Sequence, residues 1–199
     1  AGDEPVNFSS SPVYLCRQSN GITKSSVRLT GAVAAGSSHI VAYVFSSADT
    51  NRFTNAFGFE PDQYSSLVSG NGNDGYFLYY GGDHTQGFLF DAYGVENEDG
   101  TGESWEYTDK KAVRKRSITD PNPTWDPAEW VIPGETAVAA DMTPGYHAGQ
   151  VNWLGTSSVN WNARGNNWSS PHGFVPDASC NVIISGGAYQ PVVTAPSAC

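Results

Sequence analysis

The segment between Phe88 and Trp130 constrains the fold of this chain more than any other part. Its apolar start, Phe88-Leu89-Phe90, predicts a buried strand. Asp99-Gly100 then predicts a tight reversal, because Gly accepts a positive φ and Asp can bond its own backbone. Trp105 and Tyr107 alternate with polar neighbours, which predicts a second strand with one solvent-facing side. We therefore expect antiparallel strands joined by tight turns.

Three tryptophans of this segment are expected to be buried. Trp105 lies on the second predicted strand, and Trp125 and Trp130 lie among prolines that would form a stiff closing loop. Sandwich cores use such rings as large wedges between sheets.

Short β-rich runs separated by Gly, Asp and Asn turns extend this pattern toward the N-terminus. The predicted strands are residues 13–16, 26–30, 39–45, 76–80 and 87–93. A short helix is expected at residues 48–56, where Asp49 or Thr50 can cap its first turn. The composition agrees, since 22 Gly and 12 Pro among 199 residues, with only 15% charged residues, are typical of a turn-rich all-β protein. The regular spacing predicts a β-sandwich.

Six motifs in this part of the chain resemble the lamin-tail domain in its bacterial, secreted form. They are, in order, Asn73-Asp74-Gly75, Phe90-Asp91-Ala92-Tyr93-Gly94, Asp99-Gly100-Thr101-Gly102, Trp105-Glu106-Tyr107-Thr108-Asp109, Ala112-Val113-Arg114-Lys115 and Thr124-Trp125-Asp126-Pro127-Ala128-Glu129-Trp130. The resemblance ends at Trp130. It implies an immunoglobulin-like β-sandwich. Because lamin-tail domains occur as accessory modules beside secreted nucleases, it also keeps binding of a nuclease's substrate open as an alternative.

The chain is therefore expected to have three parts. Residues 1–12 are polar, carry two prolines and show no period, which predicts an N-terminal arm. Residues 13–135 would form the lamin-tail-like β-sandwich, and residues 136–199 a β-rich C-terminal extension.

Several features favour an extracellular or cell-surface protein. The chain begins with Ala1-Gly2-Asp3, which fits a mature end left by a signal peptidase or an arbitrary boundary. The sequence contains no run of about 18 apolar residues, so it predicts no membrane-spanning helix. Two sequons, Asn7-Phe8-Ser9 and Asn167-Trp168-Ser169, make Asn7 and Asn167 candidate glycosylation sites.

Three cysteines predict one disulfide and one remaining thiol. We favour a bond between Cys180 and Cys199, because residues 181–184 and 189–194 would form two strands around a glycine turn. Cys16 bonded to either of them is the alternative, and an unpaired cysteine could also bond a second chain.

The net charge of −10 argues against a general nucleic-acid binder, since duplex affinity depends on Lys and Arg, and only ten are present. Half of them lie between Lys110 and Arg116, so any phosphate contact is expected there. The alternative for this run is an exposed face that forms weak pairs with the preceding acidic loop.

That acidic loop is a weak candidate for binding Ca²⁺, which prefers carboxylate oxygens. The candidate ligands are Glu96, Glu98, Asp99 and Glu103. Their spacing is not that of a helix-loop-helix calcium site, and a solvated turn is the alternative. Similarly, residues 70–75 satisfy the dinucleotide pattern G-x-G-x-x-G, but a strand follows instead of a helix, so we predict a turn.

No catalytic residues, cofactor or firm metal site are predicted. The four histidines are far apart, and neither H-E-x-x-H nor G-x-S-x-G occurs. Trp161 and Trp168 lie among asparagines, a composition that resembles sugar-stacking surfaces, although tryptophans in β proteins are more often buried.

These observations predict a non-enzymatic extracellular structural or interaction protein. Its partner would be a second copy of itself, in a fibre or matrix assembled through terminal segments. Val6 and Phe8 of the arm would add to the sheet of a neighbour. The alternatives are an accessory module that binds a carbohydrate or the substrate of a secreted nuclease, and a monomer with a disordered tail.

Overall fold

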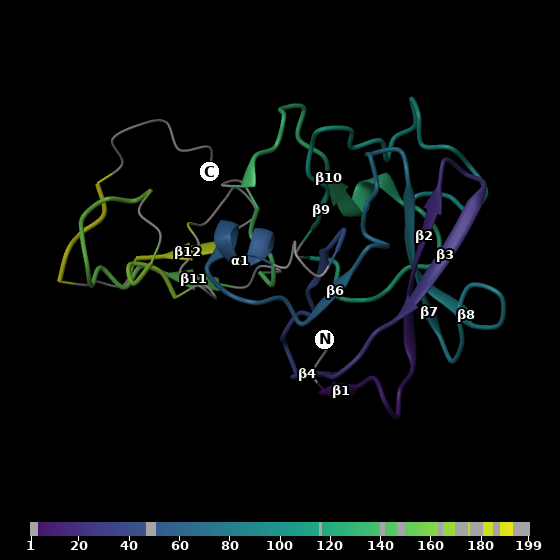
Figure 1. Cartoon of the computed structure of the whole chain (residues 1–199). Helices are drawn as coiled ribbons and strands as arrows, with labels where there is room; N and C mark the ends of the chain where they lie inside the picture. Colours follow the sequence, from purple (N-terminus) through teal and green to yellow (C-terminus); the bar gives the residue numbers. More distant parts are fainter. Residues whose placement is uncertain are drawn as a thin grey trace. The chain divides into compact units, whose positions relative to one another are not determined.

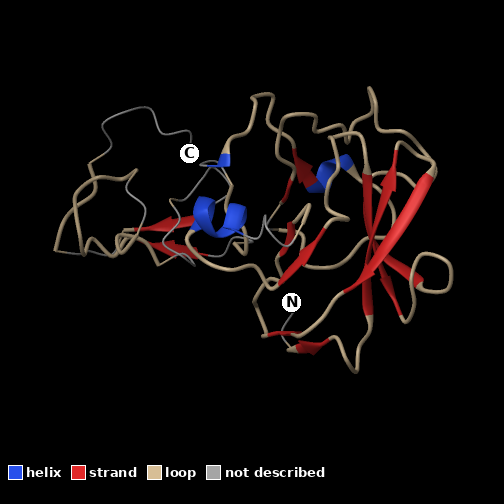
Figure 2. Cartoon of the chain, viewed as in Figure 1, coloured by secondary structure: helices blue, strands red, loops and turns tan. Residues whose placement is uncertain are grey.

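The computed structural model describes residues 4–46, 51–115, 117–139, 142–146, 150–162, 165–169, 175, 181–184 and 188–192. The chain divides into two compact units, Ala1–Met142 and Thr143–Cys199. The regular elements of the described residues are mostly strands, largely in antiparallel pairs, joined by loops, with one α-helix and a 3-10 turn at Pro127–Glu129 (Figure 2). The protein is therefore all-β, as predicted. Within the described ranges, no helix has the length and apolar character needed to cross a membrane.

A four-stranded antiparallel sheet organises the first unit (Figure 1). Its strands, in spatial order, are β3 (Thr23–Arg28), β2 (Val13–Ser19), β7 (Gly75–Tyr80) and β8 (Phe88–Tyr93). Asn20 and Gly21 join β2 to β3, and both have positive φ, 47° and 72°. These values suit a tight hairpin turn whose twist matches that of the flanking strands.

Both faces of this sheet carry buried side chains. One face holds a cluster of buried residues with two half-buried neighbours: Cys16, Phe77, Tyr79 and Ala92, with Tyr14 and Leu89. The other face contributes to a second cluster: Val13, Phe8, Leu29 and Val33, with Val6, Leu15, Val41, Leu78 and Phe90. Alternation along each strand places these two sets on opposite sides. Phe8, Val33 and Val41 of the second cluster lie outside this sheet, so a second layer packs on that face, as in two-layer folds.

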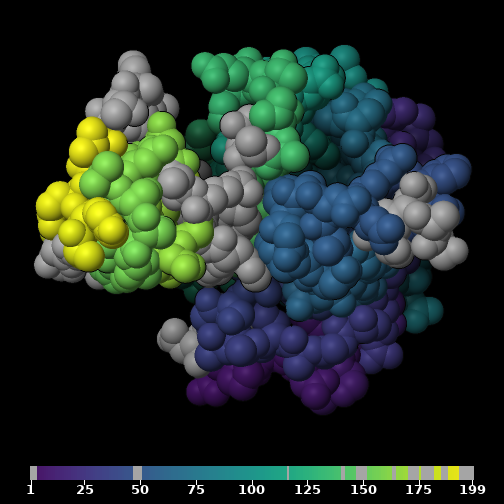
Figure 3. Space-filling model, turned by 60° about the vertical axis from the view of Figure 1, so that its left-hand side comes forward, coloured from purple at the N-terminus to yellow at the C-terminus, as the bar shows by residue number. Residues whose placement is uncertain are grey.

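Three short strand pairs complete the first unit. They are β1 (Val6–Asn7) with β4 (Ala32–Val33), β5 (Val41–Tyr43) with β6 (Gln63–Ser65), and β9 (Val113–Arg114) with β10 (Trp130–Val131). The first and third pairs are antiparallel, and the second is parallel. Helix α1 (Asn51–Phe57) connects β5 to β6 and has no buried residue. The segment that contains α1 is part of the molecular surface (Figure 3).

The prediction of a free N-terminal arm is wrong for residues 6–8. Val6 pairs with Val33 in the β1–β4 ladder, and Phe8 is only 5% exposed within the apolar cluster. The ring of Phe8 also contacts His39 edge to face at 4.9 Å. One buried aromatic residue is enough to fix a short polar segment.

The predicted strand at Trp105 and Tyr107 is also wrong. Trp105 lies in a turn, and its ring, 1% exposed, is a buried plug without a partner strand. The hydroxyl of Tyr93 donates to the Trp105 carbonyl at 2.7 Å. Trp125 and Trp130 are half-buried, and both rings contact Tyr93 edge to face, at 5.1 and 4.8 Å.

The second unit is small and built around tryptophans. Its strands β11 (Gln150–Asn152) and β12 (Asn181–Ile183) pair in parallel. The strand predicted at 181–184 is therefore present and pairs with β11, and among the residues described after it Val192 forms a bridge with Asn160. Cys180 and Cys199 lie outside the described residues, so their disulfide stays a prediction.

Candidate functional site

Arg114, the central residue of the basic run, is held inside the first unit. Its Nη1 donates to both carboxylate oxygens of Asp91 at 2.8 Å. Its Nε donates to Glu129 Oε2 at 3.1 Å, and Nη2 binds the same oxygen. The guanidinium lies 5.5 Å from the ring centroid of Trp130. The Arg114 guanidinium is therefore already paired, which leaves fewer free basic groups in the run where any phosphate contact was expected.

The same network joins β8 to the hairpin of β9 and β10. Asn122 donates from Nδ2 to Glu129 at 2.8 Å and from its backbone N to Asp91 at 3.0 Å. The hydrogen bonds from Arg114 and then from Asn122 lower the pKa of the Glu129 carboxyl below its usual range. The three charged side chains are 13–21% exposed. Their arrangement indicates a structural clamp.

The carboxylates of the acidic loop, which are the weak calcium candidates, are not gathered into one group among the residues that the structure describes. Glu96 accepts hydrogen bonds from Lys24 at 2.7 Å and from the Tyr79 hydroxyl. Asp99 accepts from the backbone N and hydroxyl of Thr101, at 3.0 and 2.9 Å. Glu96 and Asp99 therefore each accept hydrogen bonds from a different set of protein donors. Among the described residues, no group of His, Cys, Asp and Glu side chains could hold a metal ion, and this includes Glu98 and Glu103.

The sugar-stacking surface predicted at Trp161 and Trp168 is wrong, because both rings are buried. They are 7% and 2% exposed and form one cluster with Trp153. Trp168 contacts the other two rings edge to face at 4.7 and 4.8 Å, and the Trp153 and Trp161 rings lie parallel at 6.3 Å. The three tryptophans are therefore the core of the second unit.

The two candidate glycosylation sites have different environments. Asn7 is exposed. In the described part of the chain, its side chain forms hydrogen bonds only through Oδ1, which accepts from the backbone N and the hydroxyl of Ser9. Asn167 is completely buried, and its Nδ2 donates to Ser158 Oγ at 2.9 Å. Because an N-glycan is attached at Nδ2, a glycan on Asn167 would have to replace this hydrogen bond. Asn7 is therefore the site that the folded chain leaves accessible.

Cys16 is a free cysteine and is completely buried. Its place on β2, opposite Ser26 on one side and Phe77 on the other, keeps the thiol inside the sheet. Burial raises the pKa of this thiol, which disfavours the reactive thiolate.

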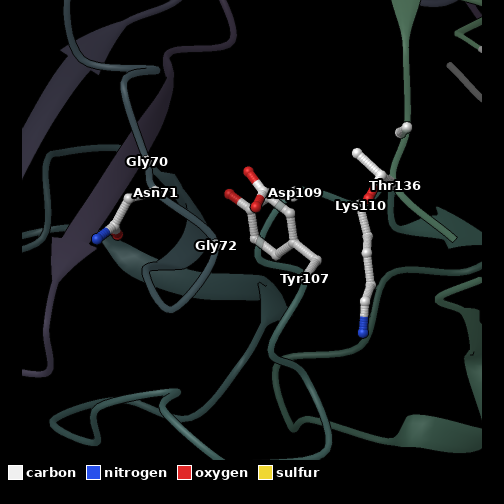
Figure 4. A pocket seen from close by; sticks show the side chains of 8 residues that line it. Gly70, Asn71, Gly72, Tyr107, Asp109, Lys110 and Thr136 are labelled. Atoms are coloured by element: carbon white, nitrogen blue, oxygen red, sulfur yellow. The ribbon is translucent and has the colours of Figure 1, made fainter. Parts of the chain in front are cut away.

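A cavity of about 290 Å³ lies where three segments of the first unit meet. Its lining residues are Gly70, Asn71, Gly72, Tyr107, Asp109, Lys110, Thr136 and Ala137. Figure 4 shows the side chains of Asn71 and Lys110 on opposite sides of the Tyr107 ring. The sequence predicted a turn at the first segment and, wrongly, a strand at the start of the second, and no pattern in it predicted that they meet residues 136–137.

One edge of the four-stranded sheet, β3, is open at Lys24 and Ser26, whereas Gln63 Nε2 donates to the outward carbonyl of Arg28 at 3.0 Å. Leu29 N donates to Val13 O, so the facing residues Tyr14 and Arg28 are a non-hydrogen-bonded pair. Alternation then directs the N–H and C=O groups of Lys24 and Ser26 away from β2. No other described residue hydrogen-bonds to these outward groups of Lys24 and Ser26.

The opposite edge, β8, is covered at Ala92, whose N–H donates to the Asn122 carbonyl at 2.9 Å. A register shift between Leu78 and Tyr79 also bends this edge. Bulges and covering loops are common ways to block a sheet edge. Strand β3 is therefore the edge at which another chain could add.

We compared the chain with protein-family models, curated proteins and solved structures, and none of the three comparisons found a match.

Proposed function

We propose that this chain is a non-enzymatic extracellular interaction module of the lamin-tail, immunoglobulin-like type, and that it associates with a second copy of itself through β3. The fold assignment is supported by the four-stranded antiparallel sheet with buried side chains on both faces. It is also supported by the motif residues Asp91, Arg114 and Glu129, which form a single network.

The observation that carries the self-association is the open edge of β3. The N-terminal segment is less suited to the role expected for it, because Val6 and Phe8 are used within their own unit. The outward groups of Lys24 and Ser26 can instead form the main-chain hydrogen bonds that hold an added strand.

The side chains of β3 favour one antiparallel register with a second β3. With Ser25 opposite Ser25 of the second copy, Lys24 faces Ser26 and Thr23 faces Val27. This register pairs two β-branched residues and puts no like charges directly opposite, both of which favour pairing. With Ser26 opposite Ser26, Lys24 would face Arg28, which is unfavourable. The contact would be isologous, as in most homodimers.

The test is sedimentation equilibrium of the full chain and of two variants at Ser25, whose side chain is exposed. Ser25→Lys places two ammonium groups opposite each other. Their repulsion should reduce the free energy of dimerisation by about 1 kcal/mol, so dimerisation should weaken roughly fivefold or more. Ser25→Thr is the matched control and should dimerise at least as well as wild type, since Thr favours strands. A wild-type chain that stays monomeric at about 1 mM, where even a weak contact of −4.1 kcal/mol is half-formed, refutes the proposal. If wild type and Ser25→Lys dimerise equally well, the dimer does not form through the edge of β3.

A further inference from the structure

The walls of the cavity at residues 70–72, 107–110 and 136–137 are fixed by main-chain hydrogen bonds between distant segments. Tyr107 N donates to Gly72 O at 2.8 Å, and Ala137 N donates to Asp109 O at 2.7 Å. Such bonds hold the three segments together without a ligand, and a preformed site avoids the entropic cost of ordering on binding.

The glycines of the first wall are required by how closely it approaches the second. A Cβ on Gly72 would lie 2.3 Å from the Thr108 Cα, and Gly72 has a φ of +108°. A Cβ on Gly70 would lie 2.5 Å from the Tyr76 hydroxyl oxygen and 3.0 Å from that of Tyr107. Loop 70–72 therefore contacts residues 107–108 directly, and there is no room for a side chain at Gly70 or Gly72.

Four polar side chains of the lining have no hydrogen bond or ion pair to any other described residue: Asn71, Asp109, Lys110 and Thr136. They provide an amide, a carboxylate, an ammonium and a hydroxyl group. The two charges are opposite, so the lining has no net charge. Asn71, Asp109 and Thr136 are exposed and Lys110 is half-buried, so a ligand that displaces their water must offer hydrogen-bonding groups in exchange, which an apolar ligand cannot do. A strongly anionic ligand would meet Asp109, and a strongly cationic one would meet Lys110.

We propose that this cavity binds one residue of a neutral carbohydrate. Sugar hydroxyls both donate and accept, so neighbouring hydroxyls can bind a carboxylate, an ammonium and an amide at the same time. The cavity volume of about 290 Å³ is at the small end of ligand sites, roughly 300–1,000 Å³, which suits a single ring. Affinity for a monosaccharide is expected to be weak, with a Kd on the order of 1 mM. This inference does not depend on the self-association of β3, whose residues do not line the cavity.

The test is a titration of the full-length protein, followed by ¹H–¹⁵N NMR, with D-glucose, D-galactose, D-mannose and N-acetyl-D-glucosamine. At least one of these should shift amide signals of residues 70–72, 107–110 and 136–137. D-glucuronate and D-glucosamine, an anion and a cation of similar size, should bind more weakly. No shift with any neutral sugar at about 50 mM, well above a Kd of about 1 mM, overturns the proposal. Shifts confined to other residues, or tighter binding of a charged sugar, also overturn it.

Variants of the lining distinguish the cavity from unspecific effects. Asp109→Asn removes the charge and retains a residue that tolerates the observed φ of 56°. Thr136→Val removes the hydroxyl at nearly constant shape. Either change should raise the Kd fivefold or more, while Glu103→Gln, which removes an exposed carboxylate outside the cavity, should not change it. If both lining variants keep their folded spectra and bind sugar as wild type does, the assignment is wrong.

Discussion

Replacement of Arg114 by Met should destabilise the first unit through the two carboxylates that it leaves behind. Methionine retains much of the apolar stem and removes the guanidinium. Asp91 then loses its bidentate partner, and Glu129 loses two hydrogen bonds. The contact with the Trp130 ring is lost as well.

We expect Arg114→Met to lower the free energy of unfolding of the first unit by about 3 kcal/mol at neutral pH. Breaking a buried ion pair by removing one partner typically costs about 3–5 kcal/mol, because the remaining charge is left without compensation. The side chains of Arg114, Asp91 and Glu129 are 13%, 21% and 14% exposed, so solvent screening places this case at the lower end.

The cost should depend on pH. Arg114 and Asn122 lower the pKa of Glu129 in the folded state. A carboxyl with a lowered folded pKa contributes stability that is present above its unfolded pKa and lost as the pH falls through its folded pKa. The variant lacks most of this contribution. Its deficit relative to wild type should therefore be full at pH 7 and shrink below about pH 4.

Native-state hydrogen exchange of the amides of β7 measures this cost for the first unit alone. A loss of about 3 kcal/mol corresponds to roughly a hundredfold faster exchange of amides that open with the whole unit, since each 1.36 kcal/mol is a factor of ten. Lys115→Met is the matched control, because Lys115 is exposed and adjacent. It should change stability by no more than about 0.5 kcal/mol. If Arg114→Met exchanges no faster than Lys115→Met, the clamp contributes nothing and our account of it is wrong.

Three further predictions concern packing, backbone and covalent structure. Trp105→Ala should cost about 3–5 kcal/mol, measured by the same exchange experiment, because the ring is 1% exposed. Gly72→Ala should cost more than about 2 kcal/mol, since its Cβ would lie 2.3 Å from the Cα of Thr108 at a positive φ. Peptide mapping without reduction should recover Cys180 linked to Cys199, a bond between residues outside the described ranges.

Each of these predictions has an outcome that contradicts it. Gly102→Ala is the control for Gly72, because it also has a positive φ but no atom within 4 Å of its Cβ position. Equal costs at the two glycines would show that backbone strain alone decides. A Trp105→Ala protein with wild-type exchange would mean that the ring is not part of the core. A mapped peptide that links Cys16 to another cysteine would refute the pairing.

The regular strands were predictable because their side-chain pattern reports burial directly. The runs predicted at 13–16, 26–30, 76–80 and 87–93 correspond to β2, β3, β7 and β8, and the helix predicted at 48–56 corresponds to α1. Each strand contains β-branched or aromatic residues, which favour strands, and turn residues follow it.

Trp105 and Phe8 could not be placed in this way. Alternation around Trp105 looks the same whether the ring caps a core from a loop or lies on a strand, and only contacts distant in sequence distinguish the two. Phe8 is a single apolar residue in a polar segment, so no period reveals that it is buried.

The candidate site was even less predictable. The cavity depends on residues 136–137 meeting loop 70–72, which no local pattern specifies. For Trp161 and Trp168, composition could not distinguish a solvent-facing platform from a core, because the same rings serve in both.

The complete burial of Cys16 bears on which of the three thiols can form a disulfide. The strands that enclose it, β3, β7 and β8, end at Tyr93, long before Cys180 in the sequence. Domains generally fold as units from the N-terminus during synthesis. If the first unit folds during synthesis, the Cys16 thiol becomes buried, with its thiolate disfavoured, before Cys180 or Cys199 has been added. The order of synthesis, and not a difference in thiol affinity, would then select the partners.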